Sequence, residues 1–102
     1  MIIVLATLEL SPGTRSDFLR AFRELAPQVR AESGCQEYVA AVDLETLIPL
    51  QPPVRPDVAT IVEKWDSVAA LEAHLIAPHM REFRTRVKPW VVSTSLQVLA
   101  PE

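Results

Sequence analysis

The stretch that decides the fold is VATIVEKWDSVAALEAHL, residues 58–75, because it passes from a strand pattern to a helix pattern within a few positions. Over residues 58–65 every second side chain, Glu63 and Trp65 among them, falls on the same face of an extended chain. Asp66 or Ser67 then offers an N-cap for the apolar periodicity that follows. The sequence therefore predicts a strand over residues 58–65 that leads directly into a helix.

Downstream, the predicted helix places Val68, Leu71 and Leu75 on one apolar stripe, with His74 at its border. Pro78 suits the first turn of a second helical segment, because the first turn of a helix does not need its backbone N–H groups. That segment directs Met80, Phe83 and Val87 inward and ends before Pro89. A last strand follows over residues 90–99, with one face that carries Trp90, Val92, Thr94, Leu96 and Val98.

Upstream, residues 2–10 are dense in aliphatic residues and stop at Ser11-Pro12-Gly13, which predicts a strand followed by a turn. Thr14 offers an N-cap, and Asp17 lies in the first helical turn, where a negative charge is favourable. The helix that begins there buries a stripe at spacings of four, three and four residues, formed by Phe18, Phe22, Leu25 and Val29. Pro27 predicts a kink or interruption near Ala26, and Ser33-Gly34 predicts the end.

Residues 35–42 read as a second strand, and residues 43–57 read as a long loop because four prolines interrupt them. Loops of this length in compact domains commonly cover a pocket or a partner. The element order is then β-α-β-β-α-β over a single domain, residues 1–102. This order predicts an α+β, ferredoxin-like fold with a four-stranded antiparallel sheet and two helices on one face.

Residues 2–10 are aliphatic on both faces of the predicted strand, whereas a sheet with one wet face would show polar alternation. A second copy stacked sheet to sheet would cover the open face. We therefore expect a homodimer that forms a dimeric α+β barrel.

Composition excludes several classes of protein. The net charge is −3 and the pI near 5.3, with no basic block, which argues against binding to nucleic acid or an anionic membrane. The longest apolar run, residues 2–8, is too short to span a bilayer and lacks a basic leader, so a cytoplasmic protein without membrane insertion is expected. Cys35 is the only cysteine, which excludes an intrachain disulfide and a cysteine-based zinc site.

Several motifs together resemble the antibiotic biosynthesis monooxygenase family of dimeric α+β barrel proteins, and most closely its small bacterial quinol monooxygenases. They are Pro12-Gly13, Glu32-Ser33-Gly34-Cys35 through Tyr38, Glu63-x-Trp65-x-Ser67, Leu71-Glu72-Ala73-His74-Leu75 and Pro78-His79-Met80. The resemblance implies cofactor-free oxidation of a quinol or similar polyphenol by O2, with a histidine as base and without flavin, haem or metal. Haem-degrading relatives carry an asparagine, a tryptophan and a histidine ligand where this chain has Ala6 or Thr7, His74 and roughly Arg84, which argues against haem binding. Anthrone oxygenases carry an asparagine where this chain has Ile61 or Val62, so the resemblance favours a quinol over an anthrone as substrate.

The candidate site residues follow from this resemblance and from the predicted elements. The predicted catalytic residues are His74, His79 and Glu63, with His74 preferred as the base because histidine titrates near neutral pH. The predicted substrate-binding residues are Trp65, Tyr38, Phe83 and Met80. The resemblance implies no cofactor. No metal is expected either, because a five-residue spacing places the two histidines about 140° apart on a helix.

Structural roles for the same residues stay open on the sequence alone. His74 can be a border histidine bonded to a backbone carbonyl, His79 a cap or dimer contact, and Trp65 a core residue. Glu63 can be solvated or paired with an arginine of the following helical segment, Arg81, Arg84 or Arg86. If Glu63 is instead buried and unpaired, its pKa should rise.

Two other functions also stay open. One is an isomerase or lyase of a small carbonyl compound, phosphorylated or not, in which the two histidines transfer protons. The other is a non-catalytic dimeric module that binds a quinone-like ligand in an apolar pocket.

Overall fold

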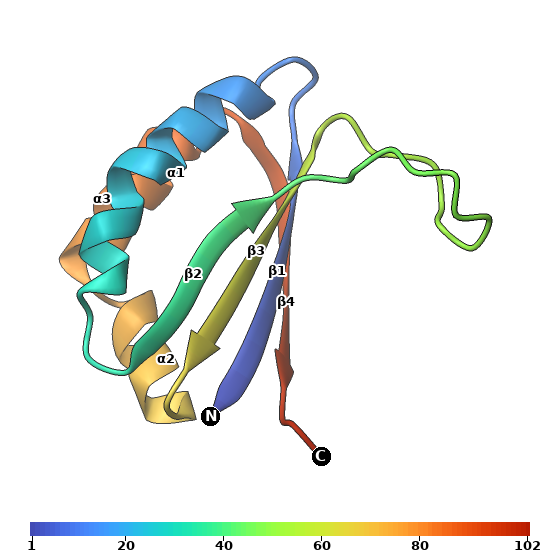
Figure 1. Ribbon diagram of the computed structural model, residues 1–102. Helices are drawn as coiled ribbons and strands as arrows, with labels where there is room; N and C mark the ends of the chain where they lie inside the picture. Colours follow the sequence, from blue (N-terminus) through green and yellow to red (C-terminus); the bar gives the residue numbers. More distant parts are fainter.

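Four strands and three helices make up the computed structural model, which describes all 102 residues. In chain order they are β1 (Ile2–Leu10), α1 (Arg15–Arg30), β2 (Cys35–Ala41), β3 (Val58–Trp65), α2 (Val68–Leu75), α3 (Pro78–Val87) and β4 (Val91–Leu99). The strands form one antiparallel sheet in the order β2-β3-β1-β4, and all three helices lie on one face of it (Figure 1). The predicted ferredoxin-like α+β fold is confirmed.

The core fills the space between the sheet and the helices. The helix-facing side of β1 is buried along its length, and the predicted stripe of α1, from Phe18 to Val29, packs above it. Burial of this apolar surface is the main force that holds the two layers together. None of the three helices is long and apolar enough to cross a membrane.

The helix ends follow the predicted signals in part. Ser67 caps α2, since its hydroxyl accepts from the Ala70 N–H at 3.1 Å, and Pro78 opens α3 at its first turn. Thr14 lies at the N-cap position of α1, but its hydroxyl donates to the Ser11 carbonyl at 2.8 Å instead of capping the helix. Val68 does not join the buried stripe of α2, because it is exposed in the first turn.

The predicted interruption at Pro27 is wrong. Helix α1 continues through Pro27 to Arg30, and the Pro27 carbonyl accepts from the Ala31 N–H at 3.2 Å. Proline removes one donor, so the Arg23 carbonyl four residues earlier loses its helical partner. Both residues lie on the exposed face of α1, where water can bond to that carbonyl, and the buried stripe on the other face maintains the helix.

Strand β4 departs from the predicted alternation. Its pairing with β1 shifts between Glu9 and Leu10, so that Glu9 pairs with Ser93 whereas Leu10 pairs with Val91. The extra residue, Val92, is exposed, and Val91 takes the helix-facing side together with Thr94 and Leu96. The prediction that Val92 shares a face with Leu96 is therefore wrong, because a β-bulge reverses the alternation at this point.

Residues 42–57 form the long loop predicted from the prolines. The loop leaves the sheet on the side away from the helices (Figure 1). Its base is closed by Arg55, whose Nε and Nη2 donate to the Asp43 carboxylate at 2.8 and 2.9 Å, and this pairing lowers the pKa of Asp43 to about 2. Leu47 and Leu50 near its tip are exposed.

Gly34 links α1 to β2 in a conformation that other residues rarely adopt. Its φ is +84°, and its carbonyl accepts from the Asp66 N–H at 2.8 Å, which ties this turn to the start of α2. A Cβ at this position would lie 2.8 Å from the Ala70 Cβ. The position therefore requires glycine for two independent reasons.

We expect Gly34→Ala to lower the free energy of unfolding by about 2–5 kcal/mol, the sum of left-handed strain and overpacking against Ala70. Gly13→Ala is the matched control, because Gly13 has a φ of +80° but a Cβ added there would meet no other atom within 4 Å. The control should lose only the strain component, about 1–2 kcal/mol. Urea unfolding of both variants measures the difference, and equal losses would contradict a steric role for Ala70.

Candidate active site

A cavity of about 510 Å³ lies between the sheet and the three helices. Twelve of its seventeen lining residues are hydrophobic, and Phe18 and Phe83 meet edge to face in its wall at a centroid distance of 5.8 Å. The volume falls in the range of small-molecule sites, and an apolar lining with a few polar groups is typical of them. The loop of residues 42–57 contributes nothing to the lining.

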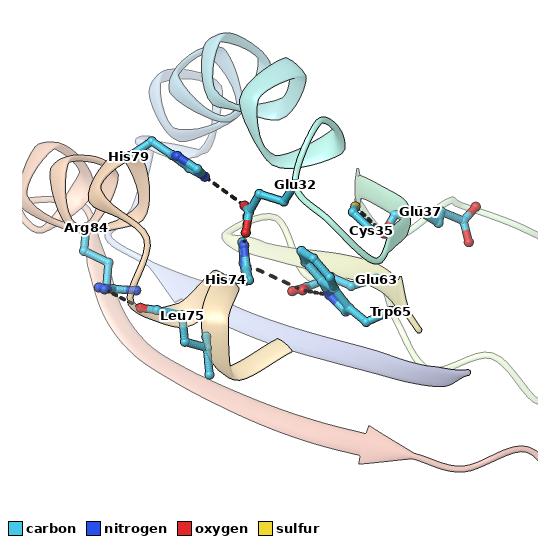
Figure 2. A network of polar contacts seen from close by, with 9 residues as sticks. All are labelled: Glu32, Cys35, Glu37, Glu63, Trp65, His74, Leu75, His79 and Arg84. Atoms are coloured by element: carbon cyan, nitrogen blue, oxygen red, sulfur yellow. Dashed lines mark hydrogen bonds and ion pairs between the residues drawn. The ribbon is translucent and has the colours of Figure 1, made fainter. Parts of the chain in front are cut away.

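His74 is the buried polar centre of this wall. Helix α2 carries it inward, and the residue is only 1% exposed. Its Nδ1 lies 2.8 Å from Glu32 Oε2, and its Nε2 lies 3.9 Å from Glu63 Oε1 (Figure 2). The ring also packs at a centroid distance of 4.7 Å against Trp65 and 5.5 Å against Tyr38. The imidazole is thus fixed in position by two aromatic rings and one hydrogen bond.

Glu63 is 5% exposed and comes from the helix-facing side of β3. Its Oε1 accepts a hydrogen bond from Trp65 Nε1 at 2.9 Å, because the alternation of the strand places both side chains on one face. Burial raises the pKa of Glu63, and the Trp65 N–H and the nearby His74 only partly oppose this effect. A carboxyl group of this kind can donate a hydrogen bond when it is protonated.

Tyr38 comes from β2 and closes the same side of the cavity, stacked on Phe22 at a centroid distance of 5.0 Å. Burial raises the pKa of its hydroxyl far above the ordinary value, and the neighbouring Glu63 and Glu32 add to the effect. The phenol therefore stays neutral at physiological pH and can donate a hydrogen bond to a ligand.

The structure brings together most of the residues predicted from the sequence. The cavity is lined by Tyr38, Glu63, His74, Met80 and Phe83. Trp65 is fully buried behind this wall, where it holds Glu63 and contacts His74. His79 does not line the cavity; its Nε2 lies 2.8 Å from Glu32 Oε2, and its side chain is 22% exposed in a separate shallow hollow between α1 and α3.

The structure contradicts two alternative roles considered above, a solvated or arginine-paired Glu63 and a His74 bonded to a backbone carbonyl. Glu63 is buried and hence not solvated. Of the arginines considered for Glu63, Arg84 donates to the Leu75 carbonyl at 2.7 Å and Arg86 pairs with Glu24. His74 is bonded to a carboxylate and not to a backbone carbonyl.

Sequence reasoning missed Glu32 as a site residue, and it also missed Lys88 in the cavity wall. Glu32 follows the end of α1, and 42 positions separate it from His74. The available signal was a carboxylate two positions before the glycine that turns the chain from α1 into β2. Local periodicity does not reveal which side chain of another element that carboxylate meets.

Replacing Glu63 with glutamine tests its buried carboxyl group. A raised pKa in the folded state means that folding favours the protonated form, so the associated stability is present below the unfolded value of 4.5 and is lost as pH rises through the folded pKa. Glutamine keeps the volume and an acceptor for Trp65 but never ionises. We therefore expect Glu63→Gln to gain stability relative to the wild type as pH rises from about 4.5 to about 8.

Urea unfolding at several pH values measures this gain, with Glu37→Gln as the matched control. Glu37 is a half-exposed carboxylate that pairs with Lys64 at 3.2 Å, and its removal should not produce the same pH trend. A stability difference between Glu63→Gln and the wild type that stays constant with pH would contradict the raised pKa.

Cys35 lies at the start of β2, and burial raises the pKa of its thiol, so its reactive thiolate is disfavoured at neutral pH. No three side chains among histidine, cysteine, aspartate and glutamate converge in a way that could hold a metal ion. The polar chemistry of the cavity therefore centres on His74 and its carboxylate neighbours.

Comparisons with known proteins bear on the family and the fold of the chain. The family model for antibiotic biosynthesis monooxygenases matches residues 1–86. The Escherichia coli K12 protein named probable quinol monooxygenase YgiN is 35% identical over 103 residues, which cover 99% of this chain and 98% of that protein.

Two solved structures share the fold. PA3566 from Pseudomonas aeruginosa has a TM-score of 0.81 at 24% identity over 99% of this chain and 93% of that one. Rv0793 from Mycobacterium tuberculosis has a TM-score of 0.80 at 24% identity over 99% and 94%. The chain belongs to the antibiotic biosynthesis monooxygenase family.

Proposed function

We propose that this protein is a cofactor-free monooxygenase that oxidises a quinol, or a similar polyphenol, with O2. The observation that carries the proposal is the position of His74, which lines an apolar cavity and is oriented by a carboxylate on its far side. The similarity to a protein named as a probable quinol monooxygenase supports the same reaction class.

The proposed chemistry begins with proton removal. His74 accepts a phenolic proton of the bound quinol, and the resulting phenolate is electron-rich enough to reduce O2. Incorporation of one oxygen atom into the ring and release of the other as water converts one quinol and one O2 into one hydroxyquinone and one water. A positioned base of suitable pKa contributes about 10²–10⁴-fold to such a step.

Two further groups can stabilise the oxygen atoms of the substrate. His74 Nε2 and Glu63 Oε1 lie 3.9 Å apart, too far for a hydrogen bond to each other, so a substrate hydroxyl on the cavity side of the two atoms could contact both. The neutral Tyr38 hydroxyl and a protonated Glu63 are both donors, and fixed donors in an apolar cavity stabilise developing negative charge strongly. The aromatic walls at Phe18 and Phe83 suit the ring system of the substrate.

Oxygen uptake with chemically reduced naphthoquinol tests the function. We expect uptake well above that of buffer, with a chelator present to suppress metal-driven autoxidation, and label from ¹⁸O2 in the hydroxyquinone product. No enhancement over buffer across several quinols would refute the proposal. Product without the label would show an oxidase that reduces O2 and not a monooxygenase.

An isomerase or lyase of a small carbonyl compound is the second candidate. It is favoured by two basic side chains in the cavity wall, Arg84 and Lys88, which could receive a phosphate group. Because such a reaction needs no O2, turnover under anaerobic conditions would select this candidate over the oxygenase.

We also propose that the protein acts as a homodimer through the open face of the sheet. Val39, Val62 and Leu5 are paired in one row across the face away from the helices, and Val39 is 36% exposed. The loop of residues 42–57, which carries the exposed Leu47 and Leu50, extends on the same side of the sheet (Figure 1). A second copy would cover both surfaces, as contiguous apolar patches usually require.

Sedimentation measures the assembly. We expect the wild type to sediment at twice the chain mass of 11.4 kDa, and Val62→Glu to sediment as a monomer because it places a charge at the centre of the proposed interface. Val68→Glu is the matched control, since Val68 is exposed on α2 on the opposite side of the molecule. A wild type that stays monomeric at tens of micromolar protein would rule out the dimer.

A further inference from the structure

Glu32 is the junction of the polar network behind the cavity. A single atom, Oε2, lies 2.8 Å from both His74 Nδ1 and His79 Nε2 (Figure 2). An ionised carboxylate has no proton to donate, so each of these two nitrogens must carry one. The neutral His74 ring then bears its proton on Nδ1, which leaves Nε2, on the side of Glu63, as a free base.

We infer that Glu32 is a positioning residue that fixes the reactive form of His74, and that His79 holds Glu32 in place. This inference rests on the proposed function, in which His74 takes a proton from the substrate. Glu32 itself does not line the cavity and so does not touch the substrate. It acts through the ring that it holds, as carboxylates do for the catalytic histidines of other enzymes.

The charges around His74 give Glu32 a second role. The titratable groups that face the ring are Glu32 after α1, Tyr38 of β2 and Glu63 of β3, with His79 of α3 reached through Glu32. Tyr38 is neutral, and burial favours the protonated form of Glu63. Glu32 is therefore the carboxylate in hydrogen-bond contact that compensates the imidazolium formed when His74 accepts a proton.

His79 accounts for why the carboxylate stays in this position. Glu32 follows the last turn of α1, and its side chain is 14% exposed, so it could otherwise turn toward solvent. The His79 N–H binds the same oxygen from α3 and closes the network from the outer side (Figure 2). The sequence motif Pro78-His79 serves this contact, and the proline fixes the first turn of α3 from which His79 extends.

Nitrogen NMR of histidine-labelled wild-type protein tests the inference without any turnover. We expect the neutral His74 ring to carry its proton on Nδ1 and to show an unprotonated Nε2. In Glu32→Gln the preference for a proton on Nδ1 should weaken, because a neutral amide oxygen is a poorer acceptor than a carboxylate, so the nitrogen shifts of the two ring positions should move toward each other. A proton on Nε2 in the neutral wild-type ring, or unchanged nitrogen shifts in Glu32→Gln, would overturn the inference.

Kinetics supply the second test. Glu32→Gln should lower kcat by up to about 10²–10⁴-fold, the full contribution of a positioned base, with KM changed by less than about threefold. Glu32→Asp should recover part of the rate, His79→Gln should keep most of it because an amide N–H can replace the Nε2 donor, and Glu37→Gln should change nothing. A kcat within about threefold of wild type in Glu32→Gln would overturn the inference. If the wild type itself oxidises no quinol, the proposed function fails, and the NMR result alone decides the role of Glu32.

Discussion

Replacing His74 with alanine is expected to lower kcat for quinol oxidation by about 10²–10⁴-fold, because the reaction loses its positioned base. His74 is the one histidine of the cavity wall, and its far nitrogen is already bonded to Glu32. His74→Asn should show a similar loss even though its amide can still donate to Glu32. The pair of variants therefore separates the loss of a base from the loss of a hydrogen bond.

Oxygen uptake with reduced naphthoquinol measures both variants. Glu72→Gln is the control, because Glu72 lies on the same helix with its side chain exposed. Added imidazole should restore part of the activity of His74→Ala by entering the vacated space. Unchanged uptake in both variants would show that His74 is a structural residue and that the oxidation, if present, uses another base.

Replacing Trp65 with alanine is expected to cost about 3–5 kcal/mol of unfolding free energy. Trp65 is fully buried, its ring packs on His74, and its N–H is bonded to Glu63. The change leaves a large void and removes the N–H that donates a hydrogen bond to the buried carboxyl group of Glu63. Since domains are commonly stable by about 5–15 kcal/mol, such a loss would leave much of the protein marginally folded.

Urea unfolding followed by circular dichroism measures this loss. Trp90→Ala is the matched control, since Trp90 is only partly buried at the edge of the core and should cost less. Trp65→Phe keeps most of the packing and removes the N–H, so its own loss relative to the wild type reports mainly the hydrogen bond to Glu63. The difference between the two Trp65 variants then reports the packing of the aromatic ring. A loss no larger for Trp65→Ala than for Trp90→Ala would contradict the central place of Trp65 in the core.

The sequence predicts the element order and most buried residues because alternation and helical periodicity are local properties. It also predicts that Glu63 and Trp65 share a face and that α2 carries His74 toward them. The reversal of alternation at Val92 was not predictable, because a bulge depends on how two strands pair. The continuity of α1 through Pro27 likewise depends on tertiary packing, which outweighs the local preference.

The same distinction holds for the site: residues placed by a local pattern could be predicted, and contacts that depend on tertiary structure could not. His74, Glu63 and Tyr38 could be proposed from their positions on predicted elements and from family motifs. The role of Glu32 could not, since it depends on a turn at Gly34 that places the end of α1 against α2. His79 was predicted as a candidate base, whereas its observed contact is with Glu32, outside the cavity.

The division of the cavity wall between elements has a consequence for how the protein can evolve. The groups that handle protons come from the end of α1 and from β2, β3 and α2, whereas edge strand β4 contributes only Val91, Thr94 and Leu96, and no member of the polar network. Strand β4 is bonded to β1 alone, so its side chains can change with little effect on the rest of the sheet. Under the proposed function, substitutions in β4 would therefore reshape the wall that meets the substrate while they leave the proton-handling groups in place, so selection could alter substrate preference and retain reactivity.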